Sequence, residues 1–166
     1  MSTPSLTPHS ARIGGILLIS LVGVAYGGTY LLQLVTGSPG QTDVQLAFAR
    51  AGHAHAGVLL ILGLVCLLLA DAVGSRGPWG LVARLGVPVA AILMPLGFFT
   101  SVAGAGTTEP NALVALVWIG GLCLAAGVLT LGVQLLRAGW TATPGVDTPR
   151  PGAAASGQSR STTETT

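Results

Sequence analysis

The sequence contains no lysine and few charged residues of any kind. All seven of its basic residues are arginines, and charged side chains make up 7% of its 166 residues, whereas 51% are hydrophobic. In soluble globular domains roughly a quarter of all residues are charged. The composition therefore excludes that class and predicts an integral membrane protein. Because the arginines are scattered and form no basic patch, no binding to nucleic acid is expected.

Cysteine is equally scarce. Cys66 and Cys123 are the only two, and each lies within an apolar run. Neither has the paired spacing of a zinc site or a thiol redox site. We therefore expect both to pack as small apolar side chains.

Long apolar runs dominate the rest of the chain. Each is longer than the roughly 20 residues that a helix needs to cross the hydrocarbon core. The sequence predicts an all-α integral membrane protein, a bundle of four transmembrane helices over residues 12–137 that lies in the lipid bilayer. Residues 1–11 and 138–166 are rich in Ser, Thr, Pro and Gly and are expected to be disordered. The expected spans are 13–35, 47–70, 81–105 and 111–136.

The positions of the arginines predict an orientation. With four spans, both termini lie on one side of the membrane. That side holds four arginines near helix ends, whereas the opposite side holds only Arg50. The positive-inside rule places both termini of this multi-pass protein on the cytoplasmic side of the cell membrane. The four arginines are Arg12, Arg76, Arg84 and Arg137.

Polar residues inside the expected spans gather in the outer half of the bundle. Tyr26, Tyr30 and Gln33 share one face of the first span by their spacing of four and three residues. Thr100 lies late in the third span, at the level where Arg50 begins the second. Polar residues within a membrane are functional candidates, so Tyr30, Gln33 and Thr100 are candidate catalytic residues. The alternative is that such hydroxyls and amides only join helices by hydrogen bonds.

Two histidines near the start of the second span, His53 and His55, are the strongest ligating side chains. Residues two apart on a helix point about 200° from each other, so only one is expected to bind a given metal. The face of His55 is an apolar strip that suits a flat macrocycle, whereas the face of His53 includes Arg50, a partner for a carboxylate. The alternative for either histidine is a hydrogen bond to a loop. The His55 strip consists of Phe48, Ala51, Gly52, Val58, Leu59, Leu62 and Cys66.

The start of the second span resembles a known family. Ala49-Arg50-Ala51, followed by His55-Ala56-Gly57, is similar to the corresponding stretch of styrene oxide isomerases and their relatives, the hydroxylaminobenzene mutases. The resemblance covers roughly residues 13–137, although only this stretch is motif-like. It implies a four-helix subunit that forms a homo-oligomer, trimeric in the isomerases, and binds haem b through the histidine of the second helix.

The resemblance also implies a reaction. Ferric iron acts as a Lewis acid on the oxygen of a small lipophilic epoxide, and the product is a carbonyl compound. The iron ligand would be His55, which leaves the opposite axial position open for substrate. The residues expected around the cofactor are Arg50, Gly52, His53, Gly57 and Leu59.

The chain departs from the family pattern at two places. Gly52 and His53 separate Ala49-Arg50-Ala51 from His55, so His53 is an alternative ligand or an auxiliary partner. The isomerases carry an asparagine after the histidine and a tyrosine in the third helix, where this chain has Val-Leu-Leu-Ile-Leu at 58–62 and Gly-Phe-Phe-Thr at 97–100. Two alternatives stay open. One is a non-enzymatic haem or copper membrane module that serves electron transfer or an accessory role, and the other is a purely structural or transporter-like bundle.

Overall fold

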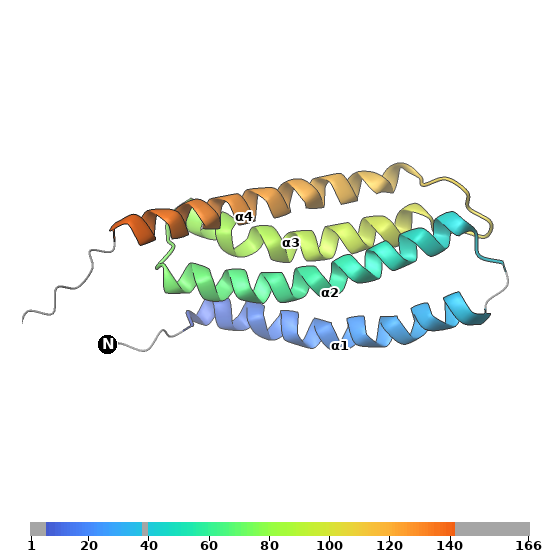
Figure 1. Ribbon diagram of the computed structural model, residues 1–166, viewed down its shortest axis with the longest axis horizontal. Helices are drawn as coiled ribbons and strands as arrows, with labels where there is room; N and C mark the ends of the chain where they lie inside the picture. The colour runs from blue at the N-terminus through green and yellow to red at the C-terminus, as the bar shows by residue number, and fades with distance from the viewer. Residues whose placement is uncertain (1–5, 38–39, 142–166) are drawn as a thin grey trace, which may run out of the picture.

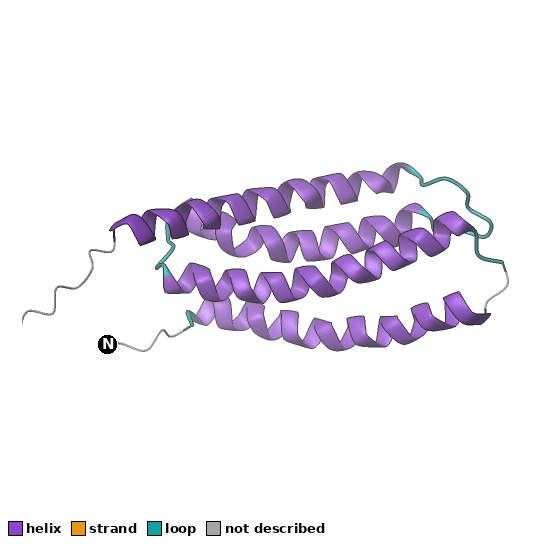
Figure 2. Cartoon of the chain, viewed as in Figure 1, coloured by secondary structure: helices purple, strands orange, loops and turns teal. Residues whose placement is uncertain are grey.

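Four long helices form the protein, as a computed structural model of the chain shows for residues 6–37 and 40–141. The helices run antiparallel and lie side by side in chain order, with α1 and α4 at the two edges (Figure 1). Within the described residues all regular structure is helical (Figure 2). The elements are α1 (Pro8–Gly37), α2 (Asp43–Ala72), α3 (Gly77–Ser101), the short η1 (Ala112–Val114) and α4 (Ala115–Thr141).

Each long helix is long and apolar enough to cross a membrane. At 1.5 Å per residue, the shortest of them, α3 with 25 residues, covers about 37 Å, more than the roughly 30 Å of hydrocarbon. The expected all-helical fold of four long helices is therefore confirmed, and all four helices are long and apolar enough to span a membrane. The ends of the helices, however, differ from the expected spans.

Helix α1 begins earlier than expected, inside the segment 1–11. The Thr7 hydroxyl accepts a hydrogen bond from the Ser10 backbone N–H at 3.2 Å and so caps the first turn. Helix α4 likewise continues to Thr141, inside the segment 138–166. Most of the predicted disorder, at residues 1–5 and 142–166, lies outside the described residues.

Helix α3 is displaced toward the N-terminus relative to its expected span of 81–105. It starts at Gly77, whose φ of 68° suits glycine, and Pro78 stands in its first turn. It ends at Ser101 because Gly104 and Gly106 follow with φ values of 126° and 65°. The loop between α3 and α4 lies at the end of the bundle opposite the start of α1 and the end of α4, which is called the outer end only for its place in the fold. This outer loop begins at Val102, earlier than the hydropathy alone indicated.

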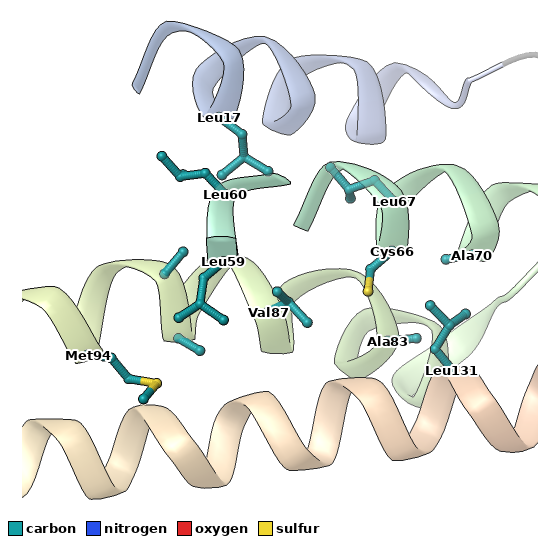
Figure 3. Close-up of a cluster of buried hydrophobic side chains, with 12 residues drawn as sticks. Leu17, Leu59, Leu60, Cys66, Leu67, Ala70, Ala83, Val87, Met94 and Leu131 are labelled. Carbon is teal, nitrogen blue, oxygen red and sulfur yellow. The ribbon is translucent and has the colours of Figure 1, made fainter. Parts of the chain in front are cut away.

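The core lies along α2 and α3, with α1 and α4 packed on either side. Leu17 of α1 points to α2, and Met94 lies between α3 and α4 (Figure 3). Helix α1 packs mainly on α2, whereas α3 and α4 share the most extensive contact. Glycine makes that contact close: a Cβ built on Gly86 of α3 would lie 2.6 Å from the Cα of Gly127 in α4. Helix α1 is thus the least enclosed of the four.

Candidate functional site

The ring of His55 is held by the backbone of its own helix. Its Nδ1 lies 2.7 Å from the carbonyl oxygen of Ala51, one turn earlier in α2. Because a carbonyl oxygen can only accept, Nδ1 carries a proton, so in the neutral imidazole Nε2 has the lone pair. Histidines that bind metals usually donate their other ring N–H to such a carbonyl or to a carboxylate, which fixes the ring and its tautomer. The backbone of α2 therefore holds the ring through Nδ1 and leaves Nε2 without a hydrogen bond inside its own helix.

Aromatic rings adjoin His55. The ring of Phe98 from α3 lies 5.1 Å from the His55 ring, centroid to centroid, and 5.6 Å from that of Phe48 in an edge-to-face arrangement. His55 is half-buried, and Val58, one turn further along α2, is exposed. This His55 face, defined by His55, Phe48, Phe98 and Val58, is apolar and lies at the surface of the bundle.

His53 lies on a different face of α2, against α1. A Cβ built on Gly28 of α1 would lie 3.3 Å from both Cε1 and Nε2 of the His53 ring, and one on Gly27 would lie 3.8 Å from Nδ1. The two glycines thus make room for the imidazole between the helices. The Cε1–Nε2 edge of His53 therefore faces α1 at Gly28.

His53 also lines a cleft of about 780 Å³ near the outer loop. Helix α1 forms one wall, α2 the floor, and the end of α3 with the outer loop the other wall. Small side chains leave the space open, and a few polar groups face it. The lining includes Gly23, Gly27, Tyr30, Gln45, Ala49 and His53.

Gln45 holds the outer loop at the mouth of this cleft. Its side-chain amide donates hydrogen bonds to the carbonyls of Val102 at 3.2 Å and Gly104 at 2.6 Å. Thr42, which caps α2 together with Gln45, also donates through its hydroxyl to the Thr107 carbonyl. The start of α2 is therefore tied to the loop that follows α3.

The structure brings together some of the candidate catalytic residues and separates others. Tyr30 lines the cleft with His53, although 59% of Tyr30 is exposed. Gln33 is exposed and is not among the residues that line the cleft. The Thr100 hydroxyl donates to the Leu96 carbonyl of its own helix at 2.7 Å. Of the three candidates, only Tyr30 thus adjoins the cleft.

The residues expected around a cofactor are also divided between surface and core. Arg50 is exposed at the outer end of α2. The space above Gly52 is filled by α3, because a Cβ there would lie 3.1 Å from Phe98 Cβ and 3.0 Å from Phe99 Cε2. Leu59 is 3% exposed in the core, and Gly57 faces Val24 of α1. Two residues of the predicted strip, Gly52 and Leu59, are therefore buried within the single chain, and Gly52 packs against α3.

Sequence reasoning missed a polar cluster at the opposite end of the bundle. Asp71 and Arg84 form an ion pair at 2.8 Å, and their side chains are only 6% and 12% exposed. Arg84 also donates to the Ser75 carbonyl at 2.7 Å, and Asp71 accepts from the Thr7 backbone N–H at 2.8 Å. The Ser75 hydroxyl donates to the side chain of Gln134 in α4. The sequence could have predicted this ion pair, since Asp71 and Arg84 carry opposite charges on either side of one short turn.

No three His, Cys, Asp or Glu side chains come together to hold a bare metal ion in the part of the chain that the structure describes. A copper site would therefore need further ligands, whereas a haem iron needs a single axial histidine. In the comparisons with known proteins, no protein-family model, no curated protein and no solved structure matches the chain.

Proposed function

We propose that this chain is a haem b-binding membrane protein in which His55 is the axial ligand. The observation that carries the proposal is the contact of His55 Nδ1 with the Ala51 carbonyl, which leaves Nε2 available to iron. A haem needs only one such histidine on an apolar surface. The absence of a three-residue ligand group in the described chain is compatible with this cofactor.

The His55 face suits a flat, apolar group. Phe98 and Phe48 supply aromatic surface beside the imidazole, and Val58 supplies exposed apolar surface on the same side of α2. His55 is half-buried at the surface of the bundle, so part of its ring is not covered by the chain itself. We therefore propose that a second copy of the chain covers this face in a homo-oligomer.

The proposed activity is that of the family that the second helix resembles. If haem were bound at the His55 face, His55 would hold its iron, and the group would supply the Lewis-acid chemistry that an epoxide isomerisation needs. The chain contributes the ligand through His55, fixes its tautomer through Ala51, and surrounds it with Phe48 and Phe98. This apolar surface favours a lipophilic substrate.

The test is the visible absorption spectrum of detergent-purified protein produced with a haem precursor. We expect the wild type to show a Soret band, His55→Ala to lose it, and His53→Ala to keep it. His9→Ala, which changes an exposed histidine at the start of α1, is the matched control and should keep the band. Helicity and elution volume of each variant check that the fold is retained.

The outcomes of this test separate the hypotheses. A colourless wild type, even after hemin is added, would refute haem binding, and a band lost only in His53→Ala would assign the iron to the other histidine. If haem is bound, turnover of an aryl epoxide without net redox change supports the isomerase. A reversible redox couple without turnover supports the electron-transfer module instead.

The cleft supports a second candidate function, the binding of a small lipophilic molecule without haem. Its volume of about 780 Å³ falls within the usual range of roughly 300–1,000 Å³ for ligand sites. Its small wall residues and its few polar groups, among them Tyr30, Gln45 and His53, are typical of such sites. This function does not depend on His55.

Filling the cleft tests this second candidate. Gly23 lines the cleft, and a Cβ on it would meet nothing within 4 Å, so Gly23→Leu occupies the space without a clash. We expect Gly23→Leu to weaken the equilibrium binding of radiolabelled styrene oxide by about ten-fold, as steric changes of this size do in apolar sites. Gly15→Leu is the matched control, because Gly15 lies on the same helix, is equally open and does not line the cleft. Equal binding by both variants would show that the ligand does not use the cleft.

A further inference from the structure

A second hollow, of about 520 Å³, lies at the end of the bundle that carries the termini. It is formed by the start of α3 and the last turns of α4, and it is separate from both histidines. One part of its wall is apolar and the other offers hydrogen-bond donors. The hollow is lined by Trp79, Leu129, Thr130, Val133, Gln134 and Arg137.

The polar residues of this hollow share one face of α4. Thr130, Gln134 and Arg137 are spaced by four and three residues, which aligns them along the helix. Gln134 Oε1 accepts the Ser75 hydroxyl, so the amide NH₂ of Gln134 remains as a donor. Thr130, Gln134 and Arg137 are called the donor face. The amide NH₂ of Gln134 and the guanidinium of Arg137 are hydrogen-bond donors and not acceptors.

Arg137 supplies an uncompensated positive charge. It is exposed, and in residues 6–37 and 40–141 it forms no ion pair, since the ion pair found there joins Arg84 to Asp71. Arg12 and Arg76 are also exposed at this end. An anion is therefore the complementary ligand, and Arg137 is the charge that lines the hollow.

The donors are arranged by depth. At 1.5 Å per residue, Thr130 lies about 10 Å further along the helix from Arg137, toward the middle of the bundle. Trp79 is 68% exposed beside the hollow and Trp140 82% exposed one turn beyond it, and tryptophan is enriched where headgroups meet hydrocarbon. Arg137 is thus placed at headgroup level. Thr130, Leu129 and Val133 lie deeper, toward the middle of the bundle.

We propose that this hollow binds one phospholipid with an anionic headgroup. The phosphate lies at Arg137, the ester carbonyls accept from Gln134 and Thr130, and an acyl chain packs on Leu129 and Val133. A zwitterionic lipid satisfies the same hydrogen bonds but brings a cation toward Arg137. The site therefore prefers net negative headgroups, such as phosphatidylglycerol.

Fluorescence quenching of Trp79 tests the proposal on the full chain. The sequence has three tryptophans, so Trp118→Phe with Trp140→Phe leaves Trp79, which lines the hollow, as the reporter. The probes are phosphatidylglycerol and phosphatidylcholine with identical brominated chains, titrated into protein in neutral detergent. We expect half-maximal quenching at about five-fold less phosphatidylglycerol than phosphatidylcholine, the effect of one arginine near an anionic lipid.

Arginine variants in the reporter background decide whether the preference belongs to the hollow. Arg137→Gln should abolish it, whereas Arg12→Gln should leave it unchanged, because Arg12 is exposed at the same end but on α1, the opposite edge of the bundle (Figure 1). Equal loss in both variants would show a general surface charge and overturn the site. No preference in the reporter protein, or a preference that survives Arg137→Gln, would overturn it as well.

A soluble competitor distinguishes a lipid from a free phosphate. Glycerol phosphate carries the same charged group without acyl chains, so it should not displace brominated phosphatidylglycerol at equal concentration. Displacement would assign the hollow to a soluble phosphate ligand and overturn the lipid site. Thr130→Val removes only the deep hydroxyl, and we expect it to weaken both lipids alike while the preference remains.

Discussion

Asp71→Ala is expected to lower the free energy of unfolding by about 3–5 kcal/mol, the usual cost of removing one partner from a buried ion pair. The carboxylate is 6% exposed and joins three helices: it is part of α2, pairs with Arg84 of α3 at 2.8 Å, and accepts from the backbone of Thr7 before α1. Without it, the Arg84 guanidinium, 12% exposed in the intact pair, loses its carboxylate partner. The size of the loss follows from that stranded charge more than from the lost attraction.

The low end of the range is the more reasonable expectation. Arg84 keeps the Ser75 carbonyl at 2.7 Å and the Gly80 carbonyl at 3.2 Å as acceptors, which partly compensate its charge. The measurement is unfolding in mixed micelles of a mild detergent and sodium dodecyl sulfate, followed by helical circular dichroism. Asp43→Ala is the control, because Asp43 is exposed in the first turn of α2 and should change stability by less than about 1 kcal/mol.

A double substitution tests the reason for the effect. The double variant Asp71→Leu with Arg84→Leu lacks both charges, so its free energy of unfolding should be higher than that of Asp71→Leu alone. If the two single substitutions and the double one are strictly additive, the charges do not interact in the folded state. Asp71→Ala as mild as Asp43→Ala would likewise show that Arg84 has access to water.

The number of helices was predictable because it depends on hydropathy alone, whereas their ends depend on individual caps. Apolar runs of more than about 20 residues leave little choice but to span the bilayer. The capping bond from Ser10 to Thr7 and the positive φ of Gly104 are local, and they moved α1 and α3 by several residues. Hydropathy averaged over a long window cannot detect them.

The candidate site was predictable to the extent that it depends on one helix. The period of an α-helix placed His53 and His55 on different faces of α2, and the structure has one against Gly28 and the other against Phe98. Which neighbour covers each face depends on the order of the helices in space, and periodicity carries no information on that order. For this reason the filling of the Gly52 position by Phe98 and Phe99 was not foreseen.

Gly86→Leu is expected to disrupt the contact of α3 with α4, the most extensive in the bundle. The first side-chain carbon would lie 2.6 Å from Gly127 Cα and 2.7 Å from the Cys123 carbonyl oxygen. Both atoms belong to the backbone, so no rotamer change relieves the clash and the helices must separate. We expect Gly86→Ala to cost about 1–3 kcal/mol and Gly86→Leu more, because overpacking increases with each added carbon.

Gly132→Leu separates this clash from the effect of changing a glycine. Gly132 is in α4, and a Cβ on it meets nothing within 4 Å, so substitution should stabilise the helix by about 0.5–1 kcal/mol through its backbone entropy. Opposite signs for Gly86 and Gly132 in the same unfolding assay would establish that α3 and α4 touch backbone to backbone. The losses of unfolding free energy from Gly127→Ala and Gly86→Ala should not add. Once one substitution has pushed the two helices apart, the second adds little further clash. Additive effects, or a neutral Gly86→Leu, would mean that the two helices are further apart than their glycines permit.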